Sequence, residues 1–173
     1  MKKNIIIILV ILGVVFFSKT KAETLIIPKE AIRLRVVANS DSKYDQQIKM
    51  KVSEQLQQDI YKLVKNTKKV EEAREKITNN LDNIDKSINN IFKKNNYNMD
   101  YNINFGYNYF PEKEYKQVKY KEGYYESIVI TIGDGKGDNW WCVLFPNLCL
   151  VDLENNEQIE YKSWVAEKLN KIF

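Results

Sequence analysis

The sequence predicts an α+β fold with an antiparallel or mixed sheet, two long helices packed on one face of the sheet, and a short C-terminal helix. Two observations lead to this class. Apolar residues recur every three or four positions through most of residues 42–94, which is typical of amphipathic helices. From residue 97 onward the repeat changes to every second position, which is typical of half-buried strands. Strands that gather after two helices, instead of alternating with them, favour α+β over α/β.

A targeting segment is expected at the N-terminus. Two lysines and an asparagine precede an unbroken apolar run, Ile5–Phe17. A membrane-spanning helix needs about 20 residues, so this shorter run predicts a secretory signal peptide over residues 1–22, cleaved after Ala22. Lys19 and Lys21 are unusual beside a cleavage position, and a short uncleaved membrane anchor is the alternative. Either segment would export residues 23–173, which we expect to form a single globular domain.

Composition excludes several classes of function. The chain of 173 residues has 27 basic and 23 acidic side chains, and four of the lysines lie in residues 1–22. The remainder is therefore neutral and gives no case for nucleic-acid binding. The absence of histidine excludes a histidine-based triad and an imidazole zinc site, and two cysteines are too few for a four-thiolate metal centre. We expect no cofactor and no metal.

The first half of the expected domain reads as one strand and two helices. Residues 31–37 alternate between apolar side chains and arginines, which predicts a half-buried strand. Ser42 followed by Asp45 resembles a capping box and predicts the start of a helix that ends at Asn66. A second continuous apolar stripe predicts one more long helix from Val70 to the asparagines at 95 and 96.

The second half reads mainly as strands. Aromatic and apolar residues alternate with Asn, Asp and Gly from Tyr97 to Tyr109, which predicts a strand with one wet and one buried face. A turn should lead into a returning strand over Tyr115–Tyr120, and a further strand should run from Tyr124 to Ile132. A segment that is apolar on both faces begins at Trp140 and extends to Val151, and Tyr161–Phe173 predicts the C-terminal helix.

Two cysteines lie in this apolar segment. Cys142 and Cys149 are equidistant from the Phe145–Pro146 bond, so a hairpin centred there would place them opposite each other at a separation that a disulfide bridges. So tight a hairpin is expected to use a cis Phe145–Pro146 bond. The alternative is two buried thiols. Trp140 and Trp141 must point to opposite faces of a strand, so either both faces are buried or one tryptophan is exposed for a partner.

Two polar segments are candidate sites. Asn39, Ser40, Asp41 and Ser42 lie where the first strand meets the first helix, and they either contact a ligand or partner or simply cap the helix. The Gly133–Asp138 loop matches no phosphate-binding motif and predicts a flexible connection, with a weak calcium site through its two aspartates as the alternative. Carboxylates are plentiful, but no spacing singles out an acid–base pair.

Two blocks of the sequence resemble those of a known family. The first is Ile32–Ser42 with Asp45 and Gln46 soon after, and the second is Gly135–Asp152, which contains the run Asn-Trp-Trp-Cys-Val-Leu-Phe-Pro. They resemble the N-terminal and C-terminal signatures of the stage II sporulation protein R family of endospore-forming bacteria. Residues 66–125 carry no motif that matches, and Asn147 stands where the family pattern has a second proline.

The resemblance implies a signalling protein and not an enzyme. Members of the family are made in the forespore and exported across its membrane into the intermembrane space. There they trigger a membrane-embedded aspartic protease of the mother cell, which processes pro-sigma-E. On this basis we expect that protease to be the partner and the protein to work close to the membrane. The candidate contact residues are Asn39, Ser40, Asp41, Asn139, Trp140 and Trp141.

Two other functions remain as alternatives from the residues alone. One is an exported cell-wall hydrolase that uses paired carboxylates. The other is a calcium- or sugar-binding module built on the Gly133–Asp138 loop.

Overall fold

The structure is a computed structural model, and it describes residues 25–26, 29–115 and 118–146. The expected signal segment, Cys149 and the expected C-terminal helix lie outside these residues.

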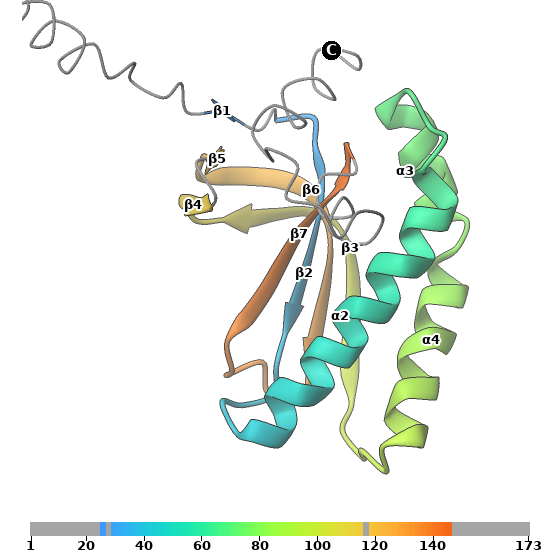
Figure 1. The fold of residues 1–173 in the computed structure, drawn as a ribbon, viewed down its shortest axis with the longest axis vertical. Coiled ribbons are helices and arrows are strands. Elements are labelled where there is room, and N and C mark those ends of the chain that lie inside the picture. The colour runs from blue at the N-terminus through green and yellow to red at the C-terminus, as the bar shows by residue number, and fades with distance from the viewer. Residues whose placement is uncertain (1–24, 27–28, 116–117, 147–173) are drawn as a thin grey trace, which may run out of the picture.

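A four-stranded mixed sheet forms the centre of the molecule (Figure 1). Its strand order is β3-β6-β2-β7, and its strands are β2 (Ile32–Val37), β3 (Tyr101–Phe110), β6 (Gly123–Ile132) and β7 (Asn139–Phe145). Strand β2 runs parallel to β6 and antiparallel to β7, while β3 pairs antiparallel with β6 over its whole length. The predicted α+β class and the mixed sheet are therefore confirmed.

A second, smaller sheet has the strand order β1-β5-β4. It consists of β1 (Leu25–Ile26), β4 (Lys113–Tyr115) and β5 (Val118–Tyr120). The prediction that Tyr115–Tyr120 returns alongside the preceding strand is wrong, because β6 is the partner of β3 and the short β4–β5 pair is inserted between them. The sequence of alternating residues does not specify which of two later segments pairs with β3.

Within the described residues three helices accompany the sheet, where the sequence predicted two long ones for this part of the chain. They are α2 (Lys43–Val64), α3 (Val70–Thr78) and α4 (Leu81–Lys94). The predicted second long helix is broken at Asn79 and Asn80. The Asn80 side chain donates to the Lys76 carbonyl at 2.8 Å, and such side-chain bonds to the backbone compete with helix continuation. The apolar spacing continues unchanged through the break and therefore does not reveal it.

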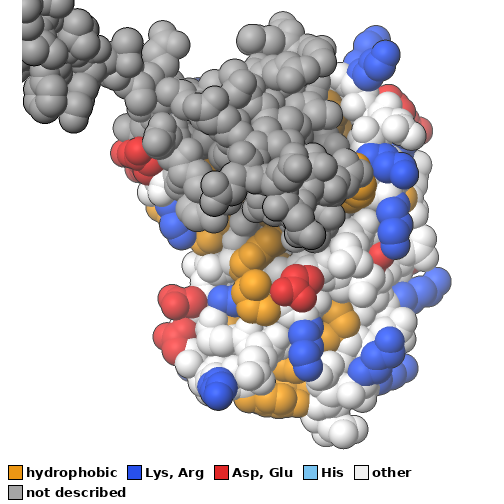
Figure 2. Space-filling view, in the orientation of Figure 1, with side chains coloured by type: hydrophobic (Ala, Val, Ile, Leu, Met, Phe, Trp, Pro, Cys, Tyr) orange, Lys and Arg blue, Asp and Glu red, His pale blue; other side chains and the backbone are white. Residues whose placement is uncertain are grey.

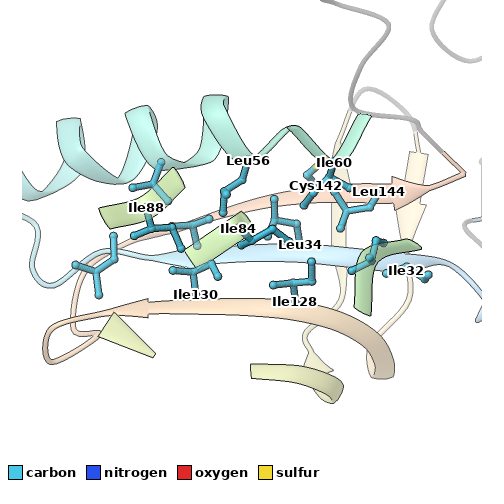
Figure 3. Packing of buried hydrophobic residues seen from close by; sticks show 14 of the residues in the cluster. Ile32, Leu34, Leu56, Ile60, Ile84, Ile88, Ile128, Ile130, Cys142 and Leu144 are labelled. Carbon is cyan, nitrogen blue, oxygen red and sulfur yellow. The ribbon is translucent and has the colours of Figure 1, made fainter. Parts of the chain in front are cut away.

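The helices bury their apolar stripes against one face of the sheet (Figure 3). Alternate residues of β2 and β6 meet the helices, so that residues such as Leu34, Ile128 and Ile130 are fully buried. Leu56 and Ile60 of α2 pack on this face, as does Ile88 of α4. Each fully buried aliphatic side chain of this kind contributes about 1.5–3 kcal/mol relative to exposure, so this layer is the main source of stability.

The long strand β3 starts later than the alternating pattern predicts. Asn96 adopts a positive φ of 48°, and the Tyr97 amide donates to the Phe92 carbonyl at 2.9 Å, so the chain turns before the strand begins at Tyr101. The prediction of one wet and one buried face also needs correction. Tyr107 and Tyr109 are exposed, whereas Phe110 is buried on the opposite face of the sheet.

The outer faces of the helices are polar. Figure 2 shows lysine and arginine side chains distributed along the helical flank of the molecule. Within the described ranges, none of the helices has the length and apolar character that crossing a membrane requires.

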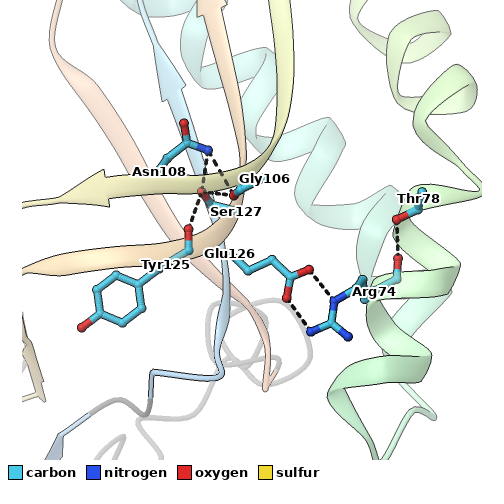
Figure 4. Close-up of polar contacts among 7 residues, drawn as sticks. All are labelled: Arg74, Thr78, Gly106, Asn108, Tyr125, Glu126 and Ser127. Carbon is cyan, nitrogen blue, oxygen red and sulfur yellow. Dashed lines mark hydrogen bonds and ion pairs between the residues drawn. The ribbon is translucent and has the colours of Figure 1, made fainter.

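One ion pair fixes the short helix α3 to the sheet (Figure 4). Arg74 of α3 donates from Nε and Nη2 to the two carboxylate oxygens of Glu126 in β6, at 2.5 and 2.9 Å. Glu126 is buried, and Arg74 is partly exposed. Bidentate arginine–carboxylate pairs are among the stronger polar contacts in proteins, so this pair orients α3 where the apolar contact is small.

We predict that Glu126→Gln lowers the free energy of unfolding by about 1.5–3 kcal/mol, because Arg74 loses its charged acceptor. Urea denaturation measures this. Lys62→Gln is the matched control, since the Lys62–Asp59 pair is exposed and 3.8 Å long, and such pairs contribute about 0–1 kcal/mol. Equal effects of the two substitutions would contradict the assignment.

Candidate functional site

The two signature segments meet at one end of the sheet. Strands β2 and β6 are parallel, so their carboxyl ends lie at the same edge, and ligands of open sheets commonly bind at such edges. Residues 38–42 follow β2, and residues 133–139 comprise the connection from β6 to β7 together with Asn139, the first residue of β7. We call these two stretches together the loop junction. The sequence placed them 91 residues apart at the least, from Ser42 to Gly133.

Backbone hydrogen bonds hold the loop junction together. The Gly137 amide donates to the Ala38 carbonyl at 3.0 Å, and the Lys136 amide donates to the Asn39 carbonyl at 3.0 Å. These bonds continue the pairing of β2 with β7 beyond the sheet edge. The glycine-rich loop is therefore a structured partner of the first signature and not the flexible connection that the sequence predicted.

Side chains of the first signature reach across to the glycine-rich loop. The Asn39 side-chain oxygen accepts the Asp134 amide at 3.0 Å, and the Asp41 carboxylate accepts the Asp138 amide at 2.7 Å. These residues therefore bind backbone groups of the glycine-rich loop. The capping interpretation of this segment is also confirmed. Ser42 Oγ accepts the Asp45 amide at 3.1 Å, and Ser42 is the N-cap of α2.

Asp45 is the buried centre of the site. Its carboxylate accepts from the Ser40 hydroxyl at 2.5 Å, the Asn39 amide at 2.9 Å and the Tyr97 hydroxyl at 2.6 Å. Tyr97 comes from the turn between α4 and β3 and packs edge-to-face on Phe92, with ring centroids 4.9 Å apart. A third part of the chain, with no motif of its own, thus supports the two signatures.

The hydrogen bonds at Asp45 decide its charge. Burial on its own would raise the pKa of the carboxyl group, but the bonds from Ser40, Tyr97, Asn39 and Ser42 outweigh burial and hold the pKa below its ordinary value. Burial and the bond to Asp45 raise the pKa of Tyr97. The site therefore holds an ionised carboxylate that accepts from neutral donors.

Two positions of the loop require glycine for lack of space. A Cβ at Gly137 would lie 2.3 Å from the Ser40 carbonyl oxygen, which is backbone and cannot move aside easily. A Cβ at Gly133 would lie 2.2 Å from the Asn39 side-chain oxygen, and this glycine also has a positive φ of 52°. The close approach of the first signature to the glycine-rich loop thus explains why glycines recur in that loop.

The six predicted contact residues do not all lie together. Asn39, Ser40, Asp41 and Asn139 lie in the loop junction, and Asn139 is exposed. Trp140 follows and packs against the helix-side core, while Trp141 lies on the opposite face of the sheet against Phe110, with ring centroids 5.0 Å apart. Both tryptophans are half-buried, so neither of the two arrangements foreseen for them describes the strand fully.

Sequence reasoning missed Tyr97 and Lys49. Tyr97 was assigned to a strand, and its buried hydroxyl gave no separate signal. Lys49 lies in α2 and donates to the Asp138 carbonyl at 3.2 Å and the Gln46 side chain at 2.5 Å. A lysine on the expected apolar side of the helix, one position from Ile48, was a signal that could have been used.

The carboxylates of the site are kept ionised. Asp45 and Asp134 both have their pKa displaced downward, opposite to the shift that a general acid needs. The described residues contain no group of three or more Asp, Glu, Cys or His placed to hold a metal ion. Asp134, a suggested calcium ligand, instead pairs with Lys136 at 2.8 Å.

Cys142 lies buried in β7, and the Phe145–Pro146 bond is cis, as the hairpin prediction required. The bridge from Cys142 to Cys149 stays a prediction, because Cys149 lies outside the described residues.

Fold and site together define a small α+β protein in which two distant signature segments form a single hydrogen-bonded surface. The sequence model of one family, stage II sporulation protein R, matches residues 28–155. The chain belongs to this family, and the resemblance noted in the sequence is confirmed.

A relative from Bacillus subtilis (strain 168), named stage II sporulation protein R, is 40% identical over 143 residues. The match covers 83% of this chain and 64% of the relative, so the chain spans less than two thirds of the relative's length. No solved structure matches the chain. Membership of the family implies a sporulation-related role.

We predict that Asp45→Asn lowers the free energy of unfolding at pH 7 by about 2–3 kcal/mol, because a neutral amide accepts less strongly and brings its own donors against Ser40 and Asn39. The folded pKa of Asp45 lies below the unfolded value of about 3.9. Its contribution is therefore complete above that pH and is lost as the pH falls through the folded pKa.

Urea denaturation at pH 7, 5 and 3 checks this. The difference between wild type and Asp45→Asn should be constant from pH 7 to 5 and smaller at pH 3. Asp100→Asn, at an exposed position in the same end of the molecule, is the control. A difference that does not change with pH would show that the charge of Asp45 is unimportant.

We predict that Gly137→Ala destabilises the protein by about 1–3 kcal/mol, because the added Cβ overlaps the Ser40 carbonyl. Gly106→Ala is the matched control, since the nearest atom to its Cβ is 4.0 Å away. Thermal unfolding of both variants is the measurement. A Gly137→Ala variant as stable as Gly106→Ala would mean that the two signatures are not in close contact.

Proposed function

We propose that the chain is an exported sporulation signal that activates a membrane-embedded aspartic protease, which then processes pro-sigma-E in the mother cell. The proposal rests on one observation above all: the two segments that resemble the family's signatures form one rigid surface at the loop junction. Membership of the stage II sporulation protein R family supports this proposed role in sporulation.

The arrangement of polar groups supports a binding role rather than catalysis. Asn39, Ser40 and Asp45 are used in holding the two signatures together, so they would act as positioning residues. Of the rim residues, Asn139 is exposed, and Asp41 is exposed although one of its carboxylate oxygens already accepts the Asp138 amide. A preformed surface of this kind binds without a large cost of ordering loops.

Activation would then be a population shift. The signal would bind the extracytoplasmic part of the protease more tightly in its active state than in its inactive state, and would raise the fraction of active protease by that difference in affinity. Nothing in this mechanism requires the signal to break a bond.

Export is the second part of the proposal. Residues 1–22 would direct the chain across the forespore membrane into the intermembrane space, either as a cleaved signal peptide or as a short anchor. A disulfide between Cys142 and Cys149 would suit a compartment outside the cytoplasm.

The test is co-expression of the full chain with the protease and pro-sigma-E in a host that does not sporulate. Processing should depend on this chain. Asn139→Ala should lower processing by about fivefold or more, equivalent to about 1 kcal/mol of binding energy, without changing thermal stability. Asn102 is an exposed asparagine on a different strand, β3, and Asn102→Ala is the control.

The outcomes separate two errors. No processing with wild-type protein, when its export is verified, would refute the proposed function. Processing at the wild-type level by both Asn139→Ala and Asp41→Ala would leave the function in place and show that the rim is not the contact.

A further inference from the structure

The face of the sheet that points away from the helices carries two arginines among aromatic rings. Arg33 and Arg35 are alternate residues of β2, on the side opposite Leu34. The Arg33 guanidinium carbon lies 3.4 Å from the centroid of the Tyr125 ring and 5.2 Å from that of Phe110. The Arg35 guanidinium carbon lies 5.4 Å from the centroid of Trp141.

A third cation joins them. Strands β3 and β6 bend at the end that leads to β4 and β5 (Figure 1), and Lys113 of β4 places its Nζ atom 5.4 Å from the centroid of the Trp141 ring. Its neighbour Glu114 has the opposite side-chain parity within β4, so the extended backbone directs it away from Lys113. We call Arg33, Arg35, Lys113 and Trp141 the cationic face.

The arginines of the cationic face lack a carboxylate. Within the described part of the chain, neither Arg33 nor Arg35 forms an ion pair with an acidic side chain. Arg33 is 3% exposed, and its Nε and Nη2 atoms have no acceptor, nor does Nε of Arg35. Burial lowers the pKa of both arginines, which in Arg33 is partly offset by Tyr125 and Tyr120.

This arrangement is unusual in physical terms. A buried charge without a counter-ion costs free energy, because the protein interior solvates it poorly. Arg74 shows the usual solution in the same molecule, with both of its donors on Glu126. Cation–π contacts with the aromatic rings compensate the arginines only in part, so an anion in contact with the cationic face would remain strongly favoured.

The outer part of the cationic face is open to solvent. Arg35 and Trp141 are half-buried and Lys113 is exposed, while Arg33 lies beneath them. An approaching carboxylate would reach Arg35 and Lys113 directly and would pack its stem against the Trp141 ring. Arginine and tryptophan are also the residues in which binding energy concentrates at protein interfaces.

We propose that the cationic face binds an acidic segment of a partner protein through a carboxylate seated between Arg35 and Lys113. The partner's identity as the protease rests on the proposed function, whereas the acidic chemistry rests on the cationic face alone. This surface lies on the side of the sheet opposite the helices and extends the contact beyond the rim of the loop junction.

A peptide experiment tests the chemistry. The probe is a fluorescein-labelled ten-residue peptide of alternating glutamate and glycine, with glutamine replacing glutamate in the control peptide. By anisotropy, the full chain should bind the glutamate peptide at least tenfold more tightly than the control, and added salt should weaken that binding. Lys113→Gln, which leaves the core intact, should reduce affinity by about fivefold or more, as should Arg35→Gln. Lys86→Gln, at an exposed position of α4, should not.

The co-expression assay tests the partner. Lys113→Gln and Arg35→Gln, if as stable as wild type, should lower processing of pro-sigma-E by at least about fivefold. Equal binding of the two peptides, or wild-type peptide binding by both variants, would overturn the proposal. Failure of the wild-type chain to support processing, with peptide discrimination retained, would refute the proposed function and leave the acidic chemistry standing.

A final variant examines whether the anion belongs to this chain. The residues after the described part include Asp152, Glu154, Glu157 and Glu160. When all four are changed to the corresponding amides, the affinity for the glutamate peptide should equal that of the wild type or exceed it by less than about twofold. An increase of tenfold or more would show that these carboxylates occupy the cationic face, and would overturn the assignment to a partner.

Discussion

The buried carboxylate of Asp45 is the constraint on which the rest of the functional end depends. It accepts from Asn39 and Ser40 of the first signature and from Tyr97 of the turn before β3. With Asn39 held in this way, its side-chain oxygen is directed at the glycine-rich loop. One ionised group therefore determines where the first signature lies, and through it where the second one lies. A charged acceptor suits this task, because hydrogen bonds to ionised groups are about twice as strong as those between neutral ones.

Much of the fold follows from local patterns in the sequence. Strand β2 and the start of α2 were predictable in position, because the arginine–aliphatic alternation and the Ser42 cap are local signals. The prediction that β2 is half-buried was wrong, because Arg33 on its second face is also buried. The break between α3 and α4 was not predictable, because the apolar stripe runs through it. Only the side-chain hydrogen bond of Asn80 to the backbone distinguishes the break from a continuous helix. Tyr97 was misplaced for a related reason: its apolar ring fits the strand pattern, but its hydroxyl is needed at Asp45.

The candidate site was predictable only as two separate segments. Both segments contain turn-forming residues, and their types indicate caps and close backbone approach, but no local rule states that they touch. That contact follows from the parallel pairing of β2 with β6, which brings the ends of both strands to one edge. The opposite directions of Trp140 and Trp141 were predictable from strand geometry. The residues that contact each tryptophan were not predictable, because they depend on the bend of β3 and β6, and Phe110 at the end of β3 packs on Trp141.

On the proposed function, rigidity and recognition would be divided between different residues in this protein. The polar groups of the first signature and Asp45 are largely engaged with one another, so a partner gains little from them directly but meets a surface that is already ordered. The arginines on the far side of the sheet, Arg33 and Arg35, are the reverse case. Aromatic rings hold them, while Nε and Nη2 of Arg33 and Nε of Arg35 lack acceptors and Nη1 of Arg35 reaches the Tyr109 carbonyl at 3.4 Å. A signal that must shift a receptor between two states needs an affinity that differs between those states. A fixed surface with unsatisfied cations can supply such a difference, because a carboxylate that the receptor presents in one state and withdraws in the other changes the binding energy without any movement of the signal itself.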